Sequence, residues 1–230
     1  KPHLVQDKFH TSLARMRAFF GGNRSGKTTS GVIEAVVCAT GELPDCYGNS
    51  LYKPKPISIP NEGWIVALDY PTSRDVLEPA LRKWLPNRLI SNWRHTDRIL
   101  ELKNGSIIAF KSVDAGWEKF QGKSLDWVWF DEEPEWTVYQ ECIIRLLDKK
   151  GYMWLTMTPL HGMSWTFDEV YDQADTDPDI EVFISQIYDN KANLPEEEIV
   201  RMERLFSDEE KEARLYGRFV EFAGLIYKSF

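Results

Sequence analysis

Cysteine and histidine are scarce in this chain of 230 residues, which has three cysteines and four histidines. Cys38, Cys46 and Cys142 are widely spaced with no C-x-x-C pair, so we expect reduced thiols rather than a disulfide framework. The histidines lack the spacing of a zinc site. No apolar run approaches the roughly 20 residues that cross a bilayer, and no signal-peptide pattern opens the chain. These absences disfavour a disulfide-stapled secreted protein, a zinc protein and a membrane-bound protein.

Positive charge is also in deficit, because the formal net charge is -8 at pH 7. Nothing in the overall charge therefore indicates nucleic-acid binding, and a DNA backbone would have to meet a local basic patch. The densest group of cations comprises Arg82, Lys83, Arg88, Arg94 and Arg98. A solvated helix face explains this group equally well.

The most informative stretch is a glycine-rich segment at residues 18–29, Ala-Phe-Phe-Gly-Gly-Asn-Arg-Ser-Gly-Lys-Thr-Thr. It contains the G-x-x-x-x-G-K-[ST] pattern of a phosphate-binding loop, the Walker A motif. Lys27 would reach the β- and γ-phosphates, and the Thr28 hydroxyl would ligate Mg²⁺. The expected buried strand at 17–20 and helix at 30–40 give the loop its required setting. We predict that the nucleotide is bound by Gly21, Gly22, Asn23, Arg24, Ser25, Gly26, Lys27, Thr28 and Thr29.

A pair of carboxylates follows an apolar strand further along the chain. Residues 125–130, Leu-Asp-Trp-Val-Trp-Phe, lead directly into Asp131 and Glu132, as in a Walker B motif. Asp131 would hold Mg²⁺ through its water shell, and Glu132 would polarise the water that attacks the γ-phosphate. The neighbouring Glu133 and Glu135 are explained by an acidic cap on the following helix. The loop and the carboxylate pair together predict ATP hydrolysis.

Two weaker signals accompany these motifs. Thr156 and Thr158 lie at the tip of an expected strand at 152–157, where ligands bind in open α/β sheets. Their hydroxyls would sense the γ-phosphate, or the strand simply ends at a proline turn; both interpretations stay open. Gln6 carries a carboxamide that can pair with adenine, although a lone glutamine is a weak signal.

Alternation of strands and helices predicts an α/β fold with a mainly parallel sheet. The remaining strands are expected at 63–70, 99–102, 106–111 and 180–187, and the remaining helices at 73–85, 138–147 and 166–174. Asn104-Gly105 predicts a hairpin, and the prolines of 41–60 predict an extended surface excursion. A small helical appendage is expected at 190–217, with helix starts at Asn193 and Ser207 and a stop at Gly217. Residues 217–230 are expected to be extended.

Taken together, these features resemble the ATPase domain of tailed-bacteriophage terminase large subunits, the motors that package DNA into procapsids. The similarity covers nearly the whole chain. It rests on Gln6 with Phe9 and His10, on the loop at 20–28, and on the segments 120–122, 131–134, 156–159 and 217–220.

The resemblance implies an ASCE-type, RecA-like P-loop fold with a core at 1–189, a helical lid at 190–217 and a linker at 218–230. That linker would lead toward a nuclease domain, which this chain should lack. The implied activity is Mg²⁺-dependent ATP hydrolysis without DNA cleavage. Glu132, Lys27 and Arg24 would be catalytic, and Thr156 with Thr158 would be the coupling motif.

The resemblance also implies partners: double-stranded DNA, the portal protein, the small terminase subunit and further copies in a pentameric ring. The ring is expected in the working motor, and the isolated domain could be monomeric. The site of action would be the cytoplasm of the infected bacterial host. A neighbour's arginine would complete the site, and Arg94 and Arg98 are candidates for it. The position before Gly122 is Gln121, so it supplies no cation.

Three other functions remain possible on sequence grounds. One is a RecA-like lobe of another helicase or translocase, which would need a second lobe. Another is a nucleotide-gated binding module that does not hydrolyse ATP. A small-molecule kinase is disfavoured because no arginine-rich acceptor lid is evident.

Overall fold

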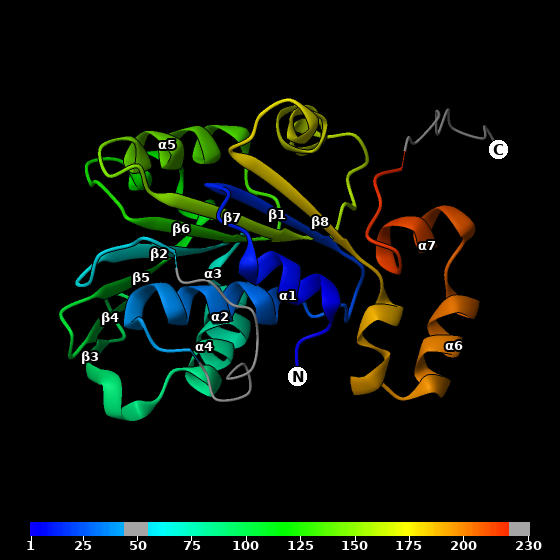
Figure 1. Cartoon of the computed structure of the whole chain (residues 1–230), viewed down its shortest axis with the longest axis horizontal. Helices are drawn as coiled ribbons and strands as arrows, with labels where there is room; N and C mark the ends of the chain where they lie inside the picture. Colours follow the sequence, from blue (N-terminus) through cyan, green and yellow to red (C-terminus); the bar gives the residue numbers. More distant parts are fainter. Residues whose placement is uncertain (44–54, 221–230) are drawn as a thin grey trace.

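A single eight-stranded sheet with strand order β3-β4-β5-β2-β6-β7-β1-β8 forms the centre of the protein (Figure 1). The computed structural model describes residues 1–43 and 55–220. Strands β5, β2, β6, β7, β1 and β8 are parallel, and β3 and β4 add an antiparallel edge. The strands are β1 Met16–Gly21, β2 Glu62–Ala67, β3 Ile90–Arg94, β4 Ile99–Leu102, β5 Ile107–Ser112, β6 Trp127–Asp131, β7 Tyr152–Met157 and β8 Ile180–Ser185.

Helices cover both faces of this sheet (Figure 1). On one face lie α1 Leu4–Thr11, α2 Lys27–Thr40 and α4 Glu78–Trp84. On the other lie α5 Trp136–Leu147 and a π-helical segment, Phe167–Tyr171. The central strands serve two cores, since Trp127 and Trp129 of β6 pack on the first face and Val128 and Phe130 on the second. This double burial explains why β6 is a continuous apolar run, and the predicted parallel α/β architecture is confirmed.

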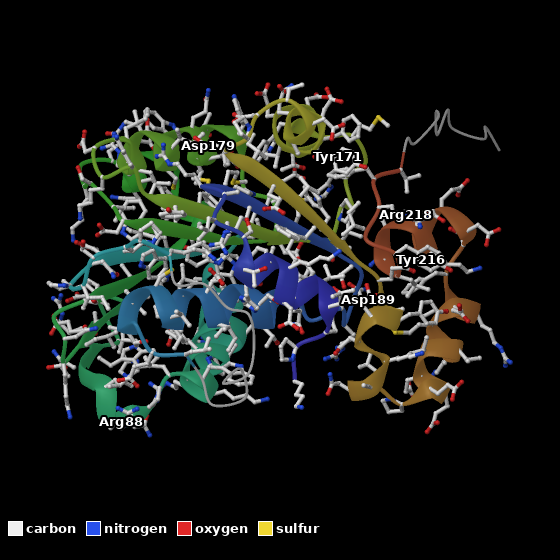
Figure 2. All side chains as sticks on the ribbon, in the orientation of Figure 1. Arg88, Tyr171, Asp179, Asp189, Tyr216 and Arg218 are labelled. Carbon is white, nitrogen blue, oxygen red and sulfur yellow. The ribbon has the colours of Figure 1, made fainter. Side chains whose placement is uncertain are left out.

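A small helical unit follows β8 and lies beyond the end of the sheet (Figure 1). It comprises 3₁₀ turns at Ile187–Asn193, α6 Glu196–Leu205 and α7 Asp208–Arg214, around a core of Ile187, Ile199 and Leu215. The Asp189 carboxylate stabilises the start of this unit by accepting a hydrogen bond from the Gln186 N–H at 2.8 Å. Figure 2 labels Asp189 and Tyr216 where this unit adjoins the sheet. We call residues 190–217 of this unit the lid.

Several expected boundaries are wrong for identifiable reasons. The helix expected at 73–85 begins at Tyr70, because the Asp69 carboxylate caps it by accepting from the Thr72 N–H at 2.7 Å. It passes through a π-helical turn at Ser73–Leu77 before α4, and the helix expected at 166–174 is likewise a π segment followed by 3₁₀ turns. Strand β2 ends at Ala67 rather than residue 70.

The structure also contains two elements that we did not predict, and one predicted helix begins at a different residue. Helix α1 and strand β3 were not expected, and β3 contains Arg94, so a single helix face does not explain the basic group. Helix α6 begins after Pro195 rather than at a cap on Asn193. The capping box at Ser207 is confirmed, as is the left-handed Gly217 (φ 67°) after α7.

The hairpin at Asn104-Gly105 is confirmed by the antiparallel pairing of β4 with β5, with Gly105 at φ 88°. Cys38 and Cys142 are buried free thiols. Cys46, most of the excursion expected at 41–60, and the end of the segment expected at 217–230 lie outside the described residues. Among the described residues no helix is long and apolar enough to cross a membrane.

Candidate active site

The strand order brings three polar segments to one edge of the sheet. Strand β7 lies between β1 and β6, and the three run parallel. The register pairs Phe20 with Met157 and Asp131 with Thr156, so the segments that follow these strands meet at the same carboxyl edge. Ligands bind at this edge in open α/β sheets. The glycine-rich loop, the carboxylates and the threonines predicted from sequence are therefore neighbours.

Close backbone approaches shape the glycine-rich loop. Gly26 adopts φ 89° at the N-cap of α2, and a Cβ there would lie 2.7 Å from Gln6 Nε2. A Cβ on Gly22 would lie 2.3 Å from the Leu215 carbonyl oxygen, and the Gly22 N–H donates to the Ser185 carbonyl at 3.0 Å. Gly22 of the loop therefore packs against the end of β8 and against the lid. Because no side chain caps α2, its first N–H groups are available to an anion.

Thr28 and Asp131 meet at the metal position that the sequence predicts. Thr28 Oγ1 donates to Asp131 Oδ1 at 3.1 Å, although 103 residues separate them. Thr156 Oγ1 donates to the same carboxylate oxygen at 2.8 Å. Asp131 is 5% exposed, so these two hydroxyl donors supply much of what water would otherwise provide. The tip of β7 is thereby joined to the carboxylate of β6.

Glu132 is held in an unusual backbone conformation by neighbours from two segments. Its φ is 74°, a left-handed value that is strained for a side chain of this size. Its N–H donates to the Thr156 carbonyl at 2.8 Å, and its Oε2 accepts from the Thr158 N–H at 2.9 Å. Its Oε1 lies 3.5 Å from Lys27 Nζ. The Thr158 hydroxyl donates to the Gly21 carbonyl at 3.0 Å, so β7 links Glu132 to the loop.

The electrostatics of this pair follow from burial. Burial and the nearby Glu132 charge raise the pKa of Asp131 from 3.8 to about 6, against the opposing influence of Thr156, Lys27 and Thr28. A carboxylate with this pKa is ionised at neutral pH and attracts a cation strongly.

Gln6 is buried, and both ends of its carboxamide have protein partners. Its Nε2 donates to the Gly26 carbonyl at 3.1 Å and to Ser30 Oγ at 3.0 Å, while Oε1 accepts from the His3 N–H at 3.1 Å. In this arrangement the side chain joins α1 to the loop rather than presenting a free edge to adenine. Beside it lies a cavity of about 300 Å³ whose lining includes Gln6, Gly26, Thr29, Trp84, Asn190 and Asn193.

Arg24 lies on the outer side of the loop, exposed and at φ 63°. Asn190 Nδ2 donates to its carbonyl at 2.7 Å, and the residue lines a cavity of about 480 Å³ together with Ile199, Met202 and Leu205 of α6. Its guanidinium makes no hydrogen bond or ion pair within the described parts of the chain. The structure therefore places Arg24 against the lid rather than against Glu132.

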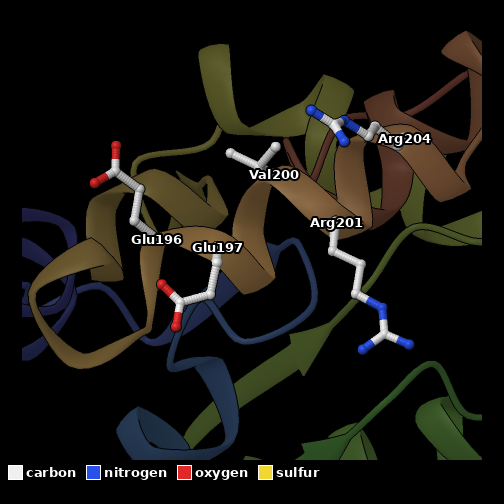
Figure 3. Close-up of a pocket in the computed structure, with 5 residues that line it drawn as sticks. All are labelled: Glu196, Glu197, Val200, Arg201 and Arg204. Atoms are coloured by element: carbon white, nitrogen blue, oxygen red, sulfur yellow. The ribbon is translucent and has the colours of Figure 1, made fainter.

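The outer face of α6 carries a separate hollow of about 460 Å³ (Figure 3). Figure 3 shows the five lining side chains projecting from this one helix: Glu196, Glu197, Val200, Arg201 and Arg204. None of them belongs to the predicted site.

Comparison with known proteins decides the family. The family described as "Terminase large subunit, T4likevirus-type, N-terminal" matches residues 18–230. The chain belongs to the terminase large subunit family. The terminase large subunit of Salmonella phage P22 is 27% identical over 183 residues, which are 64% of this chain and 36% of that protein. This chain therefore spans about a third of the length of that relative.

Solved structures show that the fold is that of a terminase ATPase domain. An arginine-to-alanine mutant of the ATPase domain of Thermus phage P74-26 large terminase superposes with a TM-score of 0.70 at 20% identity, covering 96% of this chain and 95% of the other. The large terminase of another thermophilic bacteriophage, in complex with ADP, gives 0.75 at 18% identity, covering 95% of this chain and 53% of that one.

This domain also contains a buried ion cluster that we did not predict from the sequence. Glu34 of α2 accepts from Arg17 of β1 at 2.7 Å and pairs with His10 of α1 at 2.6 Å, and Lys55 lies 3.7 Å away. All four are at most 7% exposed. The cluster joins the three elements that position the loop. One signal was present, since Arg17 interrupts an otherwise apolar strand and a buried guanidinium requires a partner.

Glu133 and Glu135 were expected to cap the following helix, and neither side chain makes a capping hydrogen bond there. Glu133 accepts from Thr166 Oγ1 at 3.0 Å and from Ser164, so it ties the segment after β6 to the segment after β7. The expectation that it caps α5 is wrong. Glu135 occupies the N-cap position of α5 but makes no capping hydrogen bond through its side chain.

Proposed function

We propose that this domain hydrolyses ATP with Mg²⁺ and that the terminase uses this reaction to drive double-stranded viral DNA into a procapsid. The observation that carries the proposal is the hydrogen-bonded network between the loop and the tips of β6 and β7. Such a network supplies a phosphate cradle, a metal position and an oriented carboxylate within one site.

The residues present suit a magnesium ion. Because the Thr28 hydroxyl donates its proton to Asp131, its oxygen lone pairs remain free to coordinate a cation. Asp131 would hold the ion through water, because Mg²⁺ prefers oxygen ligands and gives up its bound water reluctantly. Magnesium, when bound, supplies positive charge that neutralises the phosphate oxygens. Among the described residues no group of three or more His, Cys, Asp or Glu could hold a metal alone, which fits an ion shared with substrate phosphates.

Glu132 would polarise the attacking water, with one oxygen fixed by the Thr158 N–H and the other directed toward Lys27. Lys27 would hold the β- and γ-phosphates as a point charge. Thr156 and Thr158 would couple the nucleotide site to β7, since Thr156 bonds to the Asp131 carboxylate and Thr158 bonds to the Gly21 carbonyl of the loop. Arg24 would reach the γ-phosphate only after moving away from the lid.

The nucleotide would lie across the loop with its base toward the cavity of about 300 Å³ beside Gln6. The thermophilic-phage relative that has been solved with ADP supports nucleotide binding on this fold. We propose Gly21, Gly22, Asn23, Ser25, Gly26 and Thr29 as the further loop residues that hold the phosphates. Gln6 would act mainly by fixing the loop.

In the whole motor this domain would be one part of a larger protein and assembly. Its own parts would be a core at 1–189, a lid at 190–217 and a linker at 218–230 toward a nuclease domain. The partners would be double-stranded DNA, the portal protein, the small subunit and further copies in a ring of five, in the cytoplasm of the infected bacterial host. Family membership and the match to terminase ATPase domains favour this function over a helicase lobe or a kinase.

Phosphate release by wild-type protein and Glu132→Ala tests the activity. We expect the variant to lose nearly all turnover and to retain nucleotide binding, because it keeps the loop and the metal position. Glu135→Ala is the matched control, since it removes an acidic side chain three residues away that has no capping bond. Equal, slow phosphate release by wild type and Glu132→Ala would instead support a binding module without hydrolysis.

Dependence of turnover on protein concentration tests the ring. If neighbouring copies complete the site, turnover rises more than linearly with concentration. Strictly linear turnover up to high concentration would contradict activation between subunits.

A further inference from the structure

Two buried indoles of the first core contact α2 at the same residue, and only one of them also reaches the site. Trp129 and Trp154 are both fully buried, and both lie against Gly31. Trp154 Nε1 donates to the Gly31 carbonyl at 3.2 Å, an ordinary backbone contact. Trp129 Nε1 instead donates to the Thr156 hydroxyl at 2.8 Å.

The bond from Trp129 decides where the Thr156 proton goes. A threonine hydroxyl has one proton to donate and accepts through its lone pairs. Its two available acceptors are Asp131 Oδ1 at 2.8 Å and the Phe130 carbonyl at 3.4 Å. With the indole N–H occupying a lone pair, the hydroxyl is oriented by a donor on one side and directs its proton to the nearer acceptor, Asp131.

The same ring lies against α2, the helix that carries Thr28. A Cβ on Gly31 would lie 2.2 Å from Trp129 Cε2, so the indole rests directly on the α2 backbone. Thr28 lies one turn earlier on that helix and donates to Asp131 at 3.1 Å. Trp129 therefore contacts α2 three residues after Thr28, and it contacts the Thr156 hydroxyl that bonds to Asp131.

We propose that Trp129 is a positioning residue for the magnesium site: its N–H orients Thr156 toward Asp131, and its ring sets the distance between Asp131 and Thr28. The role rests on the proposed function, because it requires Asp131 and Thr28 to serve the metal. Groups that orient metal-binding side chains typically change metal affinity about 10- to 100-fold when they are removed.

The test compares Trp129→Phe with Trp154→Phe in the full chain. Both replacements keep an aromatic ring and remove one buried indole N–H, so both lower stability. The readout is the ratio of the ATPγS dissociation constant in EDTA to that in Mg²⁺, measured by calorimetry on variants whose thermal transitions confirm folding. We expect this ratio to fall about tenfold in Trp129→Phe and to stay within about twofold of wild type in Trp154→Phe.

A double variant locates the effect. The indole N–H acts through Thr156, and phenylalanine keeps a ring against α2. Adding Trp129→Phe to Thr156→Val should therefore lower the ratio no further than Thr156→Val alone. If Trp129→Phe does not fold, Thr156→Val carries the test, since removing the hydroxyl must lower the ratio as well.

The outcomes separate this inference from the proposed function. A wild-type ratio well above one that persists in Trp129→Phe, or in Thr156→Val, overturns the positioning role and leaves the magnesium site intact. A wild-type ratio near one overturns the magnesium site and the positioning role together.

Discussion

Replacing Glu34 with glutamine tests whether the buried ion cluster holds the loop-bearing elements together. The Glu34 carboxylate is fully buried and is contacted by Arg17, His10 and Lys55. Burial by itself would raise the pKa of Glu34, but the Arg17 and Lys55 charges and the bond from His10 outweigh it and lower the pKa from 4.5 to about 2. The ionised form is therefore the stable one in the fold, and Glu34→Gln removes the negative charge that pairs with the buried Arg17 guanidinium.

The size of the effect follows from two independent routes. A pKa lowered from 4.5 to about 2 corresponds to about 3 kcal/mol of folding stability at neutral pH. Removing one partner from a buried ion pair costs about 3–5 kcal/mol. At about 2 °C per kcal/mol for a chain of this size, the thermal midpoint should fall by about 6–10 °C.

Thermal and urea unfolding at pH 7 measure this loss, and Asp75→Asn is the control. Asp75 also forms a two-bond pair with an arginine, Arg74, but both side chains are more than half exposed, so its replacement should leave the midpoint unchanged. The pH dependence gives a second readout. Because the folded pKa of Glu34 is depressed, its stabilisation is complete above about pH 4.5 and disappears as the pH falls toward 2. A Glu34→Gln midpoint within about 2 °C of wild type, or an unchanged acid limb, would refute the reasoning.

Three further changes address the site. Gly26→Ala places a Cβ 2.7 Å from Gln6 Nε2 at φ 89°, so ATPγS affinity should fall at least about tenfold; calorimetry showing wild-type affinity would contradict this. Thr158→Val removes the hydroxyl bond to the loop but keeps the N–H that holds Glu132, so stability should fall by about 1–3 kcal/mol while phosphate release persists. Loss of turnover as complete as in Glu132→Ala would show that the hydroxyl itself is needed. Because burial raises the pKa of Asp131 to about 6, the Mg²⁺ enhancement of ATPγS binding should be nearly full at pH 8 and should decline as the pH falls through about 6. Titrations that are flat from pH 8 to 5 would exclude this ionisation.

The sequence by itself determined the features that depend on only a few neighbouring residues. The loop needs glycine where the backbone is left-handed, as at Gly26 with φ 89°, so the spacing of its glycines could be recognised in the sequence. A strand buried on both faces must be apolar throughout, which made β6 and the carboxylates after it recognisable. The Asn104-Gly105 hairpin and the Ser207 capping box likewise depend on local chemistry alone.

Only the tertiary structure decided how those features are joined. Gln6 faces the loop rather than a base, because α1 packs beside α2 and buries the carboxamide against Gly26. The Thr156 proton points to Asp131 because an indole two residues before that carboxylate donates to the same hydroxyl from across the strands. Local pattern specifies which groups are present at the edge of a sheet. The direction of each hydrogen bond is set by partners from other strands and helices, and their distances exist only once the layers are packed.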